Sequence, residues 1–110
     1  MADQSELVST ILIRTQEGKL SWEELSSTGF LTHVGQTMII IDRSRGERPP
    51  SMRITDESGK LLEIIEGPVF AGGGILGTMD LLSELYELAR RQALRVDETL
   101  SDLKRSLDRL

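Results

Sequence analysis

The sequence predicts a small α+β domain, with one helix before and two helices after a four-stranded antiparallel meander. Two observations lead to this prediction. Near both ends of the chain, apolar side chains recur every three or four residues, as on one face of a helix. Between residues 27 and 66 they recur every two residues, as in strands. The length of 110 residues suits one domain, so residues 1–110 are assigned to a single domain.

A helix is expected over residues 4–17, because apolar side chains share one face and Gly18 stands where glycine commonly ends a helix. The residues of that face are Leu7, Val8, Ile11, Leu12 and Thr15. Trp22, the only tryptophan, follows in a short segment. We expect its side chain to close one end of the core.

The strands are expected over residues 27–34, 37–42, 51–55 and 60–66. Gly35 is expected as the first residue of a two-residue hairpin turn that joins the first two strands. Gly59 ends a second turn, where it can take a positive φ. Residues 38–41 are apolar on both faces, which is typical of a covered central strand. The helices are therefore expected to cover one face of this meander.

Residues 67–77 form a glycine-rich loop, and Thr78 is a candidate N-cap for the helical segment 78–110. Acidic residues come early and basic residues late in this segment, and the same order then repeats. The repeat predicts a break near residues 95–97, with Asp97 capping a second helix. A single straight helix is the alternative.

The most informative feature is an apolar stripe that continues at helical spacing to the end of the chain. Its residues, which we name the leucine stripe, are Val96, Leu100, Leu103, Leu107 and Leu110. Three alternatives are open: the stripe packs back on the sheet, pairs with a second copy across a two-fold axis, or docks a different protein. Its narrow spacing resembles that of helical interfaces. We therefore treat these residues as a candidate self-interface of a homodimer.

One cationic cluster, Arg43, Arg45 and Arg48, precedes two prolines. Arginine guanidinium groups pair well with carboxylates, so this cluster is a candidate contact for an acidic partner. That partner could be the acidic N-terminal third of a second copy. The alternative is an ordinary solvated loop.

Motifs for catalysis or cofactor binding are weak. The sequence Gly72-Gly73-Gly74-Ile75-Leu76-Gly77 matches G-x-G-x-x-G, but no strand–helix–strand unit surrounds it. Asp80 and Glu84 also occupy the helix start where a phosphate would bind. His33, the only histidine, is expected on the solvent face of a strand and cannot join a histidine cluster. We expect no enzymatic activity, no cofactor and no metal site.

Composition narrows the class of partner and the compartment. A formal net charge of −5 argues against binding to a nucleic-acid backbone. The longest aliphatic run, residues 38–41, is too short to span a bilayer. The absence of cysteine fits a reducing compartment, and the acidic N-terminus differs from a secretory signal. We expect a cytoplasmic protein of bacterial character, with a protein partner and neither nucleic acid nor membrane.

Two segments carry a family resemblance: Lys19-Leu20-x-Trp22-Glu23, and residues 85–94, Leu-Tyr-Glu-Leu-Ala-Arg-Arg-Gln-Ala-Leu. Together with the order of elements, they resemble small bacterial α+β domains that stand alone or accompany larger proteins. The resemblance implies an accessory or regulatory domain and brings no catalytic residues. We therefore expect a non-enzymatic protein–protein interaction domain.

Two other functions stay open. One is a small acidic immunity or antitoxin-like protein that masks a basic partner, which the negative charge favours. The other is a ligand-binding or enzymatic domain that uses the loop of residues 72–78.

Overall fold

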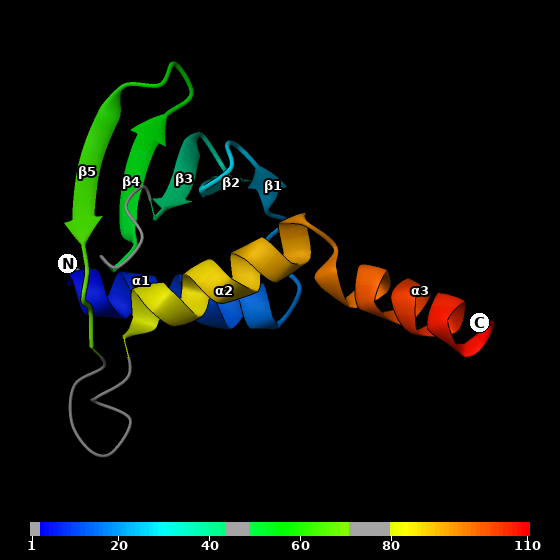
Figure 1. The fold of residues 1–110 in the computed structure, drawn as a ribbon. Helices are drawn as coiled ribbons and strands as arrows, with labels where there is room; N and C mark the ends of the chain where they lie inside the picture. Colours follow the sequence, from blue (N-terminus) through cyan, green and yellow to red (C-terminus); the bar gives the residue numbers. More distant parts are fainter. Residues whose placement is uncertain (1–2, 44–48, 71–79) are drawn as a thin grey trace.

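The computed structural model describes residues 3–43, 49–70 and 80–110 (Figure 1). The elements in chain order are α1 (Gln4–Gln16), β1 (Glu23–Glu24), β2 (Gly29–Val34), β3 (Thr37–Asp42), β4 (Ser51–Asp56), β5 (Leu61–Glu66), α2 (Leu81–Ala93) and α3 (Val96–Asp108). This order confirms the α+β class, with one helix before the sheet and two after it. The predicted number of four strands was too low, because Glu23 and Glu24 add a short fifth strand beside β2.

The sheet is an antiparallel meander in the order β1-β2-β3-β4-β5. Val34 pairs with Thr37 across the predicted two-residue turn, where Gly35 has a φ of 59°. At the turn before β5, the carboxylate of Asp56 accepts hydrogen bonds from the backbone N–H groups of Ser58 and Lys60. Both turns therefore form where the sequence predicted them.

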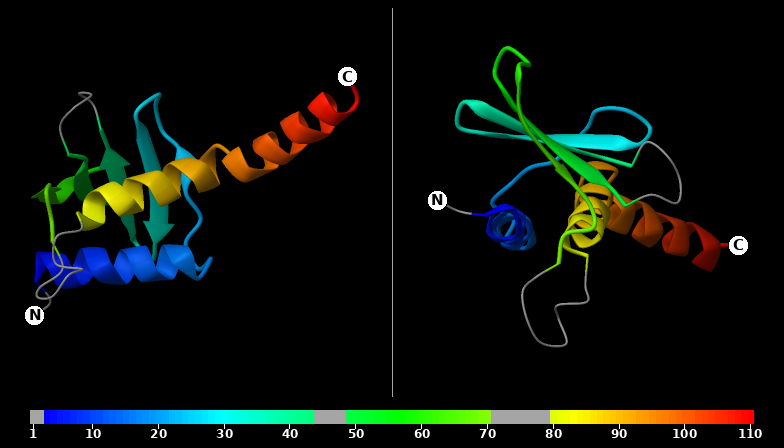
Figure 2. Two further views of the ribbon diagram at one scale, coloured as in Figure 1. Left: turned by 60° about the horizontal axis from the view of Figure 1, so that its bottom comes forward. Right: turned by 90° about the vertical axis from the view of Figure 1, so that its left-hand side faces the viewer.

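The core lies between one face of the sheet and the helices α1 and α2, which run along that face (Figure 2). The sheet contributes Phe30, Ile39, Ile41, Met52 and Ile65. Leu82, Leu85 and Ala89 face them from α2 and are fully buried, as is Val8 of α1. Burying each such aliphatic side chain is worth about 1.5–3 kcal/mol, so these contacts hold the layers together.

Trp22 closes one end of this core, as predicted. Only 4% of its surface is exposed. Its indole Nε1 donates a hydrogen bond to Thr15 Oγ1 of α1 at 3.0 Å, and its backbone N–H donates to Gln92 Oε1 of α2 at 2.7 Å. The residue thus ties both helices to the chain segment that enters the sheet.

Helix α2 begins three residues later than the predicted segment, and its N-cap is Asp80 rather than Thr78, which lies outside the described residues. The Asp80 carboxylate accepts hydrogen bonds from the N–H of Leu82 at 3.2 Å, from the N–H of Val69 at 2.9 Å and from the Ser83 hydroxyl at 2.6 Å. These three donors fix the start of the helix, because together they bind both oxygens of the carboxylate.

The predicted break after α2 is confirmed. Arg95 has a φ of 53°, in the left-handed region, and stands directly before α3. Asp97 was expected to cap the second helix, but it lies in the first turn of α3 and makes no cap hydrogen bond. Its carboxylate instead accepts from Arg91 of α2 at 2.7 Å. The two helices are therefore separated by the left-handed backbone conformation of Arg95 and not by a side-chain cap.

Candidate functional site

Helix α3 extends away from the sheet and from α1, as a projection from the body (Figure 1). It has 13 residues, none of which is buried within the described structure. Helix α2 has the same length and buries five residues. The two helices are both amphipathic in sequence, but only α2 uses its apolar face in the core.

The leucine stripe is the apolar face of α3, and its last residue, Leu110, lies two residues beyond the end of the helix. Val96 is half-buried near α2, whereas Leu100, Leu103, Leu107 and Leu110 are 51%, 53%, 57% and 100% exposed. In this structure the stripe therefore does not pack back on its own sheet, which was one of the three alternatives. Each half-exposed leucine has roughly 1 kcal/mol still to gain from being covered.

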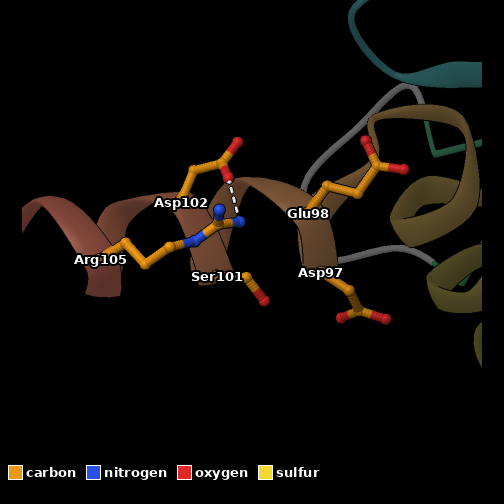
Figure 3. Close-up of a pocket in the computed structure, with 5 residues that line it drawn as sticks. All are labelled: Asp97, Glu98, Ser101, Asp102 and Arg105. Atoms are coloured by element: carbon orange, nitrogen blue, oxygen red, sulfur yellow. Dashed lines mark hydrogen bonds and ion pairs between the residues drawn. The ribbon is translucent and has the colours of Figure 1, made fainter.

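The rest of the surface of α3, from the edge of the stripe to the opposite side, is polar. Asp97, Glu98, Ser101, Asp102 and Arg105 line an open depression there (Figure 3). Arg105 Nη2 lies 2.8 Å from Asp102 Oδ1, and both side chains are about 70% exposed, at 70% and 72%. Exposed ion pairs of this kind contribute little to stability. This polar face lies toward solvent.

The candidate arginine contact is only partly described. The guanidinium of Arg43 lies over the ring of Tyr86, with Cζ 5.0 Å from the ring centroid. The Tyr86 hydroxyl in turn donates to the backbone oxygen of Thr28 at 3.1 Å. Arg43 thus packs against the body of the domain, while Arg45 and Arg48 lie outside the described residues. The candidate contact of the three arginines with an acidic partner therefore stays a prediction.

A second, partly apolar surface lies on the sheet face opposite α1 and α2. Pairing places Leu31 beside Ile40, Ile40 beside Arg53, and Arg53 beside Ile64 on that face. Ile64 is 42% exposed, and the helices α1 and α2 lie on the other side of the sheet (Figure 2). Its sequence signal is the run of residues 38–41, which is apolar on both faces of β3, although a covered central strand has the same pattern.

The remaining candidate chemistry is limited. The loop of residues 72–78 lies outside the described residues, and His33 is exposed on β2. Across residues 3–43, 49–70 and 80–110, no group of three or more histidine, aspartate or glutamate side chains is placed to hold a metal ion. In the same ranges, no helix is both long and apolar enough to cross a bilayer.

Comparisons with protein-family models, curated proteins and solved structures found no match for the chain. The resemblance to small bacterial accessory domains therefore stays a prediction. Function has to be inferred from the geometry of α3 and its leucine stripe.

Proposed function

We propose that this protein is a non-enzymatic protein–protein interaction domain that associates with a second copy of itself through α3. One observation carries the proposal: α3 buries none of its residues, yet it presents a continuous stripe of leucines. An uncovered stripe of this kind favours aggregation unless a partner covers it. A two-fold pairing covers the stripe of each copy with the stripe of the other.

The expected affinity is modest. Three leucines of the stripe are already about half covered by their own helix, so each has about 1 kcal/mol left to contribute. Two short helices also make an interface at the small end of the range for specific complexes. We expect dissociation constants on the order of tens of micromolar, as in regulated or transient assemblies.

The proposed role suits a reducing cellular compartment. A domain without cysteine has no disulfide to lose in a reducing compartment, which supports a cytoplasmic role. The body of the domain would hold α3 in a defined direction, since Trp22 and Gln92 fix the end of α2 from which α3 projects. In this proposal the body is the support and α3 is the interacting element.

The test is the double substitution Leu103→Glu with Leu107→Glu, measured by light scattering at about several hundred micromolar protein, well above the expected dissociation constant. The wild type should be dimeric and the variant monomeric, with an unchanged circular dichroism spectrum. A matched control, Ser101→Glu with Arg109→Gln, changes the net charge by the same amount on the polar side of α3 and should remain dimeric.

Two results would contradict the proposal. One is a wild type that is monomeric at every concentration tested. The other is a control that dissociates as fully as the stripe variant, because the effect would then be one of charge and not of the leucines. A monomeric wild type that binds a different protein through the same leucines would favour the third alternative for the stripe, a heterologous partner.

A further inference from the structure

The polar residues that border the leucine stripe differ on its two sides. The stripe residues follow one another at steps of four and three, the heptad pattern of helices that pack side by side. Asp97 and Lys104 border the stripe on one side, seven residues apart. Thr99 and Ser106 border it on the other. One edge of the stripe is therefore charged, with its acid near the start of α3 and its base near the end, and the other edge is neutral.

From this asymmetry we infer that the two α3 helices of the dimer pack antiparallel, with Asp97 of each copy opposite Lys104 of the other. The inference rests on the proposed self-association and adds its orientation and register. In that register Val96 meets Leu107 of the second copy, and Leu100 meets its Leu103. The charged edges of the two helices then face each other, and two Asp97–Lys104 pairs flank the leucine layers.

A parallel arrangement lacks this complementarity. It brings the charged edge of one helix against the neutral edge of the other, so that Lys104 meets Thr99. It also places the acidic first turns, with Asp97 and Glu98, beside each other at one end. Antiparallel packing aligns the helix dipoles favourably and separates the acidic turns. Charge complementarity therefore selects the antiparallel pair.

Asp97 and Lys104 already form ion pairs within the single chain, but these pairs do not prevent them from pairing with a second copy. Lys104 Nζ lies 2.8 Å from Asp108 Oδ2, with 78% of the lysine side chain exposed, and the Asp97 side chain is 83% exposed in its pair with Arg91. Exposed pairs such as these contribute little to stability. Asp97 and Lys104 can turn to the partner at little cost.

Orientation can be tested by disulfide trapping, since the full chain has no cysteine and each variant carries a single thiol. Val96 and Leu107 lie eleven residues apart, about 16 Å along the helix, which is much farther than a disulfide can bridge. In a glutathione redox buffer, Val96→Cys alone and Leu107→Cys alone should not cross-link. An equimolar mixture of the two should form the mixed dimer. Ser101→Cys, on the polar side, serves as the accessible control and should not cross-link.

Cross-linking of each variant with itself would overturn the antiparallel register in favour of a parallel one. An absence of any cross-link in a protein that is dimeric by light scattering would overturn it as well, because the interface would lie elsewhere. If the wild type is monomeric by light scattering, the proposed function fails and the orientation fails with it. The two failures are thus told apart by the mass of the wild type.

Charge reversal provides a second test that keeps the leucines intact. Asp97→Lys or Lys104→Asp alone should each weaken dimerisation roughly tenfold, because two like-charged pairs replace two opposite ones. The combined Asp97→Lys and Lys104→Asp variant should recover most of the affinity. Equal affinity for all three variants and the wild type would contradict the register.

Discussion

The same substitution, leucine to alanine, should have opposite consequences at Leu85 and Leu103. Leu85 is fully buried in α2, so Leu85→Ala removes its burial and leaves a cavity in the core, at a cost of about 3 kcal/mol in the free energy of unfolding. Leu103 is 53% exposed, and no core atoms close around it, so Leu103→Ala should change the stability of the monomer by less than about 0.5 kcal/mol.

The assay is urea unfolding followed by the fluorescence of the buried Trp22, at a concentration low enough to keep the protein monomeric. At higher concentration, Leu103→Ala should weaken dimerisation by about 1 kcal/mol per chain, which is roughly 30-fold in the dissociation constant of a dimer that counts the change twice. Leu85→Ala should leave association of the folded protein unchanged. A loss of more than about 2 kcal/mol for Leu103→Ala in dilute solution would refute the reasoning, because the stripe would then belong to the core.

Two further predictions concern side chains that fix the body of the domain. Asp80→Ala should destabilise the fold by about 2–4 kcal/mol in urea unfolding, because it removes the cap of α2 and leaves the N–H of Val69 without its acceptor. Asp80→Asn keeps an acceptor oxygen and should cost less than half as much. Equal losses of stability in the two variants would contradict the capping role of Asp80. The Ser58 hydroxyl, and next the N–H of Lys60, hold the pKa of Asp56 below its ordinary value, so the stabilisation from this carboxylate should be present above about pH 4 and be lost as the pH falls through the lowered pKa. Ser58→Ala should raise that pKa in an NMR titration, and an unchanged pKa would show that the hydroxyl bond does not form.

Much of the fold could be predicted from periodicity. The bounds of α1, the four longer strands and the break before α3 all follow from changes between a period of about 3.6 and a period of 2, with glycine at the turns. Strand β1 could not be found in this way, because two residues are too few to show a period. Asp80 could not be predicted as the N-cap of α2 either. One of the donors to its carboxylate is the N–H of Val69, which the fold brings from the other side of the loop.

The candidate site was predictable in composition but not in placement. The spacing of Leu100, Leu103 and Leu107 shows that they share one face of a helix, yet the same spacing fits a helix folded on the sheet. The direction of α3 depends on the left-handed conformation of Arg95, which is uncommon outside glycine and is not encoded by a local motif. In the same way, the stacking of Arg43 on Tyr86 joins distant parts of the chain and has no sequence signal.

Self-association through α3 can be measured by sedimentation equilibrium of the unmodified protein over a dilution series from about 200 to 1 µM. Self-association of this kind predicts an average mass that rises reversibly with concentration from that of one chain toward that of two. It also predicts that the data fit a single monomer–dimer equilibrium, without larger species, because a two-fold pairing closes on itself. A mass equal to one chain at every concentration would contradict the claim.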